Sequence, residues 1–388
     1  MLKPNPIYYT PAHEDFRRML RRFVAQEIAP HVNQWDEAET FPLALYEQAA
    51  ALGILGLGFP AEYGGSPEVD AFHHLMVAEE LARAGSGGVV ASLMSHSIAA
   101  PPILHAGSAA LKARVLPEII AGKKISALAV TETSGGSDVA ALQTTARRNG
   151  AHYVVDGEKT FITSGMRADY FTVAVRTDPE NRGASGISLL LIESETAGFS
   201  RQPLKKMGWW ASDTAQLHFD ACRVPVHNLI GAEGQGFRII MRNFNLERFN
   251  LAAGAYGFAQ VCYEDALSWA RERRTFGQRL IEHQVVSHKL VEMATRLGML
   301  RALLEESAWR LGDPAQQGAD LVAQSCMLKN AAARNLQFCA DAAVQTLGGM
   351  GYMRGTRVER IYREVKVNMI GGGAEEVMKD LAARQLGY

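Results

Sequence analysis

Residues 129–138 read Ala129-Val130-Thr131-Glu132-Thr133-Ser134-Gly135-Gly136-Ser137-Asp138 and follow an apolar run that begins at Ile125. We expect the run to be a strand and the glycines and hydroxyls after it to form a tight loop. Such a loop turns backbone N–H groups and small hydroxyls toward one point, where a phosphate or an electron-rich ring edge can bind. Most clusters of this composition are ordinary loops, so these residues by themselves leave a binding loop and a plain turn both open.

Composition and charge describe an ordinary globular chain of 388 residues, long enough for two or three domains. Lys and Arg (40) nearly balance Asp and Glu (41), so charge gives no reason to expect a nucleic acid or an anionic membrane surface as a partner. No two of the four cysteines form a CxxC pair, which favours buried, reduced thiols and a cytoplasmic protein. Residues 1–6 lack the apolar core of a signal peptide.

The first 125 residues are expected to be entirely helical. Thr10-Pro11 is a typical helix start, because the threonine can cap the first turn and proline fits the first helical position. Residues 84–111 contain no Asp, Glu, Lys or Arg, but their prolines, paired glycines, histidines and serines favour a buried helix that ends near the prolines over a membrane span. Apolar residues at helical spacing predict further helices at 41–55, 72–84 and 109–121.

The middle of the chain, from residue 126 to about 232, is expected to form a small β domain, either a barrel or a sandwich. Two β-rich runs meet at Asp156-Gly157, which predicts a hairpin turn there. Short apolar runs at 170–175, 187–192 and 216–219 continue the strand pattern between turns that contain glycine or proline.

Long helical patterns return after Gln235, which predicts a C-terminal four-helix bundle. The expected helices are 236–274, 284–312, 319–347 and a last one from about residue 374. The chain is therefore assigned to the α+β class, with domains at 1–125, 126–232 and 233–388.

Several familiar catalytic patterns do not occur in the sequence. It contains no GxGxxG, no Walker loop, no HExxH and no GxSxG, and its eleven histidines have no metal-like spacing. A redox enzyme with this sequence would need a cofactor held in another way, and no metal site is expected.

Residues 129–138 match the first signature of the acyl-CoA dehydrogenases at every position, and the chain resembles this family over nearly its whole length. Phe161-Ile162-Thr163-Ser164 resembles the family's aromatic-Ile-Thr motif, although the usual aromatic is tryptophan. Residues 271–278 resemble its Arg-x-x-Phe-Gly motif, and residues 345–352 its second signature, with Gly355 where an acid or amide is expected. The resemblance implies an N-terminal all-α domain, a middle β-barrel and a C-terminal four-helix bundle.

The same resemblance implies that FAD is the cofactor, with the flavin beside the first signature and the aromatic-Ile-Thr motif. It places Arg273 on the FAD diphosphate, and the second signature on the adenosine half of an FAD reached from a neighbouring subunit. The expected cofactor-binding residues are Leu128, Val130, Thr131, Gly136, Ser137, Phe161, Thr163, Arg273, Phe276, Gln284, Gln345, Gly348, Gly349, Ala374 and Glu376.

Glu247 is the catalytic base that the resemblance implies. Many family members carry the base in a Tyr-Glu-Gly-Thr segment, but the matching residues here are Gly371-Gly372-Gly373-Ala374. Isovaleryl- and long-chain-type members carry it instead in a Leu-Glu-Arg motif, which Leu246-Glu247-Arg248 resembles.

Helical spacing supports this base independently of the family. Glu247 shares a helix face with Phe244, Leu251 and Gly254, and an apolar face should desolvate the carboxylate and raise its pKa. A solvated Glu-Arg pair on an exposed helix face is the alternative.

The glycines at 371–373 are expected to complete the site. Gly372, assigned with Glu247 to the catalytic residues, leaves room for the carboxylate, and its N–H would donate to the thioester carbonyl as in relatives. A hinge is the alternative. The position of Trp210 usually holds arginine, and its role is left open. The expected substrate-binding residues are Ser92, Ser137, Phe244, Arg248 and Gly373.

The function implied by the resemblance is oxidation of an acyl-CoA thioester, with a medium, long or branched chain, to the trans-2-enoyl-CoA. Glu247 takes the pro-R α-hydrogen as a proton, and the β-hydrogen moves as hydride to flavin N5. An electron-transferring flavoprotein is the expected acceptor, and a homotetramer built from two dimers is the expected assembly. The alternatives are an acyl-CoA oxidase or flavin monooxygenase of the same fold, and a non-enzymatic acyl-CoA-binding relative.

Overall fold

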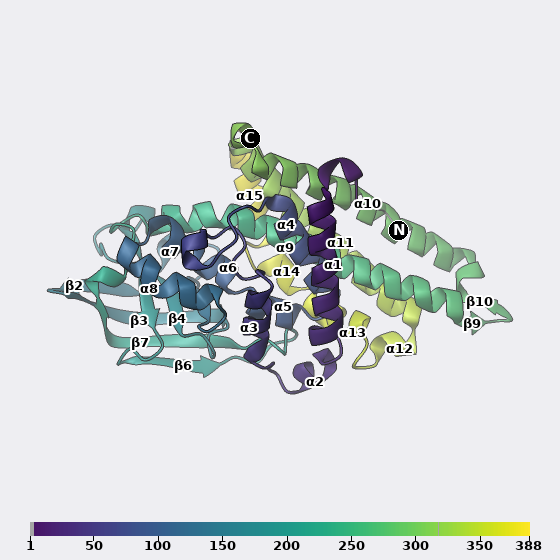
Figure 1. Cartoon of the computed structure of the whole chain (residues 1–388), viewed down its shortest axis with the longest axis horizontal. Helices are drawn as coiled ribbons and strands as arrows, with labels where there is room; N and C mark the ends of the chain where they lie inside the picture. The colour runs from purple at the N-terminus through teal and green to yellow at the C-terminus, as the bar shows by residue number, and fades with distance from the viewer. Residues whose placement is uncertain (1–3, 317) are drawn as a thin grey trace.

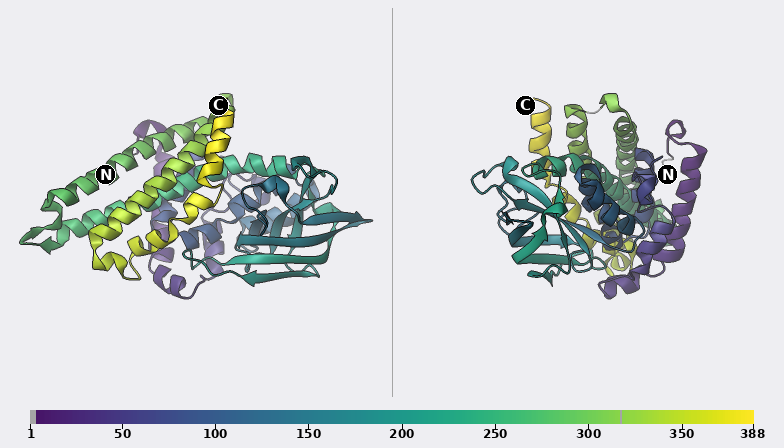
Figure 2. Two further views of the ribbon diagram at one scale, coloured as in Figure 1. Left: turned by 180° about the vertical axis from the view of Figure 1, so that it is seen from behind. Right: turned by 60° about the vertical axis from the view of Figure 1, so that its left-hand side comes forward.

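The structure of the chain is a computed structural model that describes residues 4–316 and 318–388. It consists of an N-terminal group of helices, a middle β-sheet and a C-terminal group of long helices (Figure 1). The sheet occupies one end of an elongated molecule, and the long helices extend to the opposite end (Figure 2). The predicted three-part α+β architecture is confirmed.

Side-chain caps begin α1 and α8, two of the helices that the sequence predicts. Thr10 accepts the backbone N–H of His13, and Pro11 is the first residue of α1. Ser108 caps α8 in the same way through the N–H of Leu111. The helices are α1 (Pro11–Phe23, followed by a π-helical turn at Val24–Ile28), α2 (Val32–Glu37), α3 (Ala44–Ala51), α4 (Ala71–Ala82), α5 (Gly87–Leu93), α6 (His96–Ala99), α7 (Pro101–Ala106) and α8 (Ala109–Ile120).

Residues 84–111 contain two short helices, and not one, before the prolines at which the predicted buried helix ends. The whole segment forms the three short helices α5, α6 and α7, because the chain leaves helical geometry at Met94 and Pro101 begins a new helix. No single helix in the described ranges is long and apolar enough to cross a membrane. The pair Gly87–Leu93 and His96–Ala106, bent by 43°, passes that test only together, on length and composition.

An eight-stranded sheet forms the middle domain, in the order β6-β7-β3-β2-β4-β5-β8 with β1 paired parallel to β4. β4 and β5 are buried along nearly their whole length, which agrees with their mostly apolar residues. The strands are β1 (Ser126–Ala129), β2 (Thr145–Asn149), β3 (His152–Thr163), β4 (Tyr170–Arg176), β5 (Ile187–Glu193), β6 (Phe199–Pro203), β7 (Thr214–Pro225) and β8 (Leu229–Ile230).

The prediction of a hairpin turn at Asp156-Gly157 is wrong. Strand β3 runs straight through this pair, with an irregularity in its pairing to β7 between Val155 and Gly157. A Cβ at position 157 would lie 2.7 Å from the hydroxyl oxygen of Thr144, so glycine serves a close approach of two backbones there. The turn lies one step earlier, at Gly150-Ala151, where β2 turns into β3.

The predicted bundle is formed by four helices (Figure 1). They are the long helices α9 (Gly236–Glu272), α10 (Gln284–Gly312) and α11 (Ala319–Leu347), and the shorter α15 (Glu375–Gln385). Buried alanines on α9 and α11 let these two helices pack closely. All four cysteines of the chain are free and buried, as predicted. The shorter C-terminal elements are β9 (Arg274–Thr275), β10 (Gln278–Arg279), α12 (Gly349–Tyr352), α13 (Arg357–Glu364) and α14 (Val367–Ile370).

One buried carboxylate joins the three domains. Glu364 of α13 accepts the backbone N–H of Gly87 from the N-terminal domain at 2.7 Å and that of Trp209 from the middle domain at 3.2 Å. The neighbouring Trp210 packs under two arginines, with the guanidinium of Arg363 3.8 Å and that of Arg354 4.5 Å from its ring centre. Packing at the domain junction is therefore the role of Trp210 that the structure shows.

Candidate active site

A buried ion pair holds the loop that follows β1. The ammonium of Lys159 on β3 is completely buried and donates to the carbonyl of Val130 at 3.0 Å and to Glu132 Oε1 at 2.7 Å. Burial lowers the pKa of Lys159 to about 8, against the opposing charge of Glu132. The backbone N–H of Thr160 also donates to the carbonyl of Thr131, at 2.9 Å. These bonds bring residues 129–138 against residues 161–164, the two motifs expected to meet at the flavin.

Phe161, near the end of β3, has an unusual backbone conformation. Its φ is +59°, a left-handed conformation that costs free energy for a bulky residue, and its side chain is 69% exposed. Strain of this kind persists where the surrounding structure imposes it, which here is the bonded strand around Lys159. The result is a flat apolar ring presented beside the exposed residues 133–138.

Glu247 on α9 carries an unpaired carboxylate. Its Oε2 is buried and has no hydrogen-bond partner in the protein. Burial raises the pKa of Glu247 from its ordinary 4.5 to about 7, against the opposing charges of Arg248 and Lys329. A carboxylate with a near-neutral pKa and a free oxygen has the properties of a general base.

The glycine loop 371–373 packs against the face of α9 that carries Glu247. Gly372 has a φ of +66°, and a Cβ there would lie 2.3 Å from Leu251 Cδ1 and 3.7 Å from Glu247 Oε1. Leu251 and the left-handed backbone are thus the main reasons for glycine at 372, and the room left for the carboxylate is a smaller one.

Two cations lie close to Glu247. Lys329 of α11 is buried and donates from Nζ to the carbonyl of Gly373 at 2.6 Å. Arg248 is also buried, donates to Asn245 Oδ1 at 3.2 Å, and lies with its guanidinium 5.8 Å from the ring centre of Phe244. Lys329 was missed in the sequence, although a lone lysine between Leu328 and the alanines at 331–333 is a signal for a buried charge.

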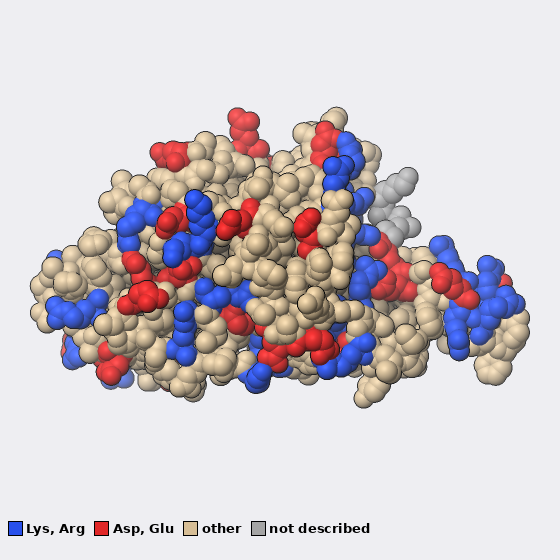
Figure 3. Space-filling view, turned by 60° about the horizontal axis from the view of Figure 1, so that its bottom comes forward, with Lys and Arg blue, Asp and Glu red and all other residues tan. Residues whose placement is uncertain are grey.

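The remaining predicted cofactor residues lie elsewhere. Phe276, 98% exposed, is at the tip between β9 and β10, where the exposed arginines 271, 273, 274 and 279 form a basic end (Figure 3). This end is far from the sheet (Figure 1). One chain therefore does not bring the two sets of predicted FAD contacts together. The distant set is Arg273, Phe276, Gln284, Gln345, Gly348 and Gly349, all exposed.

Comparison with known proteins identifies the family of this chain. Family models match residues 10–123 (acyl-CoA dehydrogenase, N-terminal domain), 127–222 (middle domain) and 234–387 (C-terminal domain). The chain belongs to the acyl-CoA dehydrogenase family. Its members are flavoproteins, so FAD is the cofactor and dehydrogenation of an acyl-CoA is the reaction class.

Individual acyl-CoA dehydrogenases cover the whole chain. A solved structure described as a probable acyl-CoA dehydrogenase from Mycobacterium abscessus is 44% identical, with a TM-score of 0.94, covering 98% of this chain and all of that one. The mitochondrial isobutyryl-CoA dehydrogenase of Dictyostelium discoideum is 34% identical over 99% of this chain and 91% of its own length. The mitochondrial long-chain specific acyl-CoA dehydrogenase of Rattus norvegicus is 33% identical over 97% and 87%.

The residues at the sheet edge fit the flavin of an acyl-CoA dehydrogenase. A flat aromatic ring is exposed at Phe161, and small exposed residues at Gly136 and Ser137 leave the loop open beside it. Thr163, two residues beyond Phe161, is half-buried, as are Leu128 and Thr131. Ala374 caps α15 and Glu376 is exposed in its first turn, next to the glycine loop.

Ser92 is the expected substrate residue that lies deepest in the protein. It is completely buried, its hydroxyl is 2.8 Å from that of Ser212, and it accepts the hydroxyl of Ser164 at 3.2 Å. Its hydroxyl is thus used in a contact between domains. Contact of Ser92 with an acyl chain stays a prediction.

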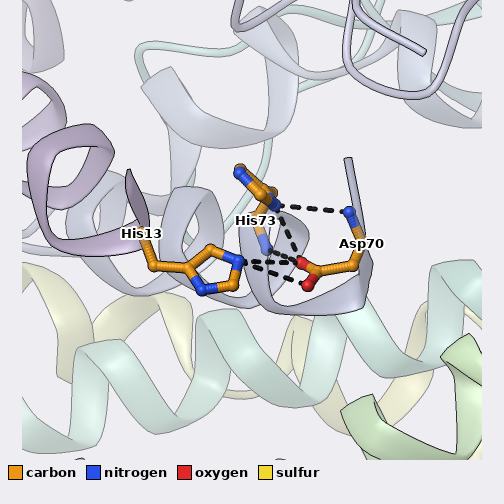
Figure 4. Close-up of side chains that lie close together, drawn as sticks. All are labelled: His13, Asp70 and His73. Atoms are coloured by element: carbon orange, nitrogen blue, oxygen red, sulfur yellow. Dashed lines mark hydrogen bonds and ion pairs between the residues drawn. The ribbon is translucent and has the colours of Figure 1, made fainter. Parts of the chain in front are cut away.

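His13, Asp70 and His73 are the one group with metal-like spacing among the described residues (Figure 4). Nδ1 of His13 accepts the backbone N–H of Thr10 at 3.0 Å and its Nε2 lies 3.2 Å from Asp70 Oδ2, while Nδ1 of His73 lies 2.8 Å from Asp70 Oδ1. A metal-binding histidine needs a free ligand nitrogen and usually donates from the other one. The cluster is therefore explained by helix capping at the starts of α1 and α4.

Proposed function

We propose that this acyl-CoA dehydrogenase removes the α-proton of its thioester substrate with Glu247, giving the trans-2-enoyl-CoA. The observation that carries the proposal is the buried, unpartnered Oε2 of Glu247, on the helix face against which the Gly372 loop packs. The raised pKa of this carboxylate suits proton abstraction near neutral pH.

Each group around Glu247 would have a separate role in the abstraction of the α-proton. Leu251 keeps an apolar contact beside the carboxylate and excludes water. The backbone N–H of Gly372 would donate to the thioester carbonyl and stabilise the enolate-like charge that forms as the proton leaves. When bound, FAD supplies the acceptor for the β-hydrogen, which leaves as hydride toward N5. The substrate is also proposed to contact four further residues: Ser137, Phe244, Arg248 and Gly373.

We further propose that two chains share each FAD. The flavin would lie at the sheet edge of one chain, near Thr131, Phe161 and Thr163, and the basic end of a second chain would bind its diphosphate through Arg273. The separation of these two sets within one chain supports this arrangement, which a dimer or a tetramer of two dimers provides. An electron-transferring flavoprotein is the proposed electron acceptor.

Branched or longer acyl chains are the proposed substrates. The Leu-Glu-Arg placement of Glu247 is typical of isovaleryl- and long-chain-type members, and the relatives above include an isobutyryl-CoA and a long-chain enzyme. Three short helices rich in small residues, α5 to α7, give this part of the fold small side chains near the expected acyl site.

Substrate bleaching of the flavin tests the assignment of the base. Glu247→Gln should keep FAD, seen as the flavin band near 450 nm, and lose at least about 100-fold in the rate of anaerobic bleaching by isobutyryl-CoA or palmitoyl-CoA. Glu68→Gln, in an exposed loop, is the matched control and should bleach like the native enzyme. Full bleaching of Glu247→Gln would refute the base. Turnover that consumes oxygen without any other acceptor would instead assign an oxidase.

A further inference from the structure

Lys329 bonds to the loop that carries one of the two groups used by the proposed reaction and interacts electrostatically with the other. It projects from α11, is 1% exposed, and bonds to the carbonyl of Gly373 at 2.6 Å. Gly373 directly follows Gly372, whose N–H is the proposed donor to the thioester. Lys329 also lies within electrostatic reach of Glu247, the proposed base.

We propose that Lys329 is a positioning residue for proton abstraction, which holds the Gly371–Gly373 loop by its hydrogen bond and keeps Glu247 ionised by its charge. This inference rests on the proposed function. The acyl thioester would lie between the loop and the carboxylate, so one ammonium would fix both the oxyanion donor and the base.

Burial makes a purely structural lysine expensive at this position. Its one hydrogen-bond acceptor among the described residues is Gly373 O, whereas an ammonium has three donors. A neutral amide would hold a carbonyl equally well and would cost less to bury. The charge is compensated if an anion is close, and Glu247, whose Oε2 is buried without a partner, is the first anion within electrostatic reach.

The other charges around Lys329 do not replace this pairing. Burial lowers the pKa of Lys329 to about 8, Glu247 opposes that shift, and Arg248 adds to it. Glu375, at the start of α15, also faces Lys329, but it bonds to Arg334 and to Lys379. Cys326, one turn earlier on α11, is the remaining titratable neighbour, and burial raises the pKa of its thiol.

Two substitutions separate the charge from the hydrogen bond. Lys329→Gln removes the charge and keeps a donor for Gly373, whereas Lys329→Met removes both. Lys123→Met, which removes an exposed lysine before β1, is the matched control. The first measurement is the anaerobic bleaching rate from pH 5.5 to 9, with isobutyryl-CoA or palmitoyl-CoA, whichever bleaches the native enzyme. The second is the infrared band of protonated Glu247 in the substrate-free protein, assigned by subtracting Glu247→Gln.

Both Lys329 variants should move the acid limb of the rate profile, and the infrared titration, upward by about one pH unit, because a nearby cation no longer stabilises the carboxylate. Lys329→Met should also lose about tenfold or more in the plateau rate, and Lys329→Gln should keep most of it, because only the methionine frees the loop. Unmoved titrations in both variants would refute the charge role, and equal plateau rates in both would refute the loop role.

The infrared titration keeps this test separate from the proposed function. If the native enzyme is not bleached, or Glu247→Gln bleaches fully, the proposed function fails, while the band still reports whether Lys329 sets the ionisation of Glu247. Lys329→Gln alone decides the charge role if the methionine variant does not fold.

Discussion

The unpaired carboxylate of Glu247 should destabilise the folded protein above neutral pH, and Glu247→Gln should remove that cost. The folded pKa of about 7 lies above the ordinary 4.5 of an unfolded chain. Between these values the folded protein keeps a proton that the unfolded chain has lost, so stability falls as the pH rises from 4.5 to 7. The full difference corresponds to about 3 kcal/mol above pH 7.

Thermal unfolding at several pH values measures this cost. With about 2 cal/mol/K of unfolding entropy per residue, about 3 kcal/mol corresponds to a rise in Tm of about 4 °C for a chain of this length. We expect Glu247→Gln to exceed the native protein by that amount at pH 8 and by much less at pH 5, with FAD saturating in both. Glu68→Gln should show no such pH dependence. A difference that is the same at pH 5 and pH 8 would show that the carboxylate is not desolvated.

Two further substitutions test the structures that hold the site. Gly372→Ala should cost about 2 kcal/mol in thermal unfolding, because of its φ of +66° and the 2.3 Å approach to Leu251, and Leu251→Ala in the same chain should recover part of it. A Gly372→Ala protein as stable as the native one would contradict this packing. Lys159→Met should cost about 3 to 5 kcal/mol in denaturant unfolding, because Glu132 is left buried without its counter-ion and keeps only the backbone N–H groups of Gln143 and Thr144, whereas the exposed Lys123→Met should cost almost nothing. A loss below about 1 kcal/mol for Lys159→Met would mean that these two N–H groups alone stabilise the carboxylate of Glu132.

The long helices are the part of the fold that the sequence predicts best. The predicted helices 284–312 and 319–347 coincide with α10 and α11 at both ends. Their signals are local, since apolar spacing defines the body of each helix, and Pro314 and Gly348 lie just beyond the two C-terminal ends.

Strand pairing was predicted less well, because it depends on partners far along the chain. Asp156-Gly157 has the composition of a turn, but β7, about 60 residues later, pairs across it and keeps β3 extended. The turn was formed instead at Gly150-Ala151. Non-local contacts also act on the segment 84–111, which is divided into short helices. In this segment Gly87 contacts the C-terminal domain and Ser92 contacts the middle domain.

The sequence predicted the reacting groups of the candidate site better than the residues that hold those groups in place. Helical spacing and the Leu-Glu-Arg resemblance singled out Glu247, and the structure supplies the burial and the missing partner on which its proposed role rests. Lys159 and Lys329 escaped notice because their partners, at Glu132 and Gly373, are far away in sequence. The separation of the sheet from the tip between β9 and β10 is likewise a property of the assembled helices, which no local pattern contains.

The burial of all four cysteines has a practical consequence for work on this enzyme. Thiol-specific reagents such as maleimides react with exposed thiolates, and the native surface offers them none. A single cysteine introduced at the tip between β9 and β10 would therefore be the one labelling position, without a cysteine-free background. A fluorophore there would report directly on whether, and how fast, the basic end of one chain docks onto another.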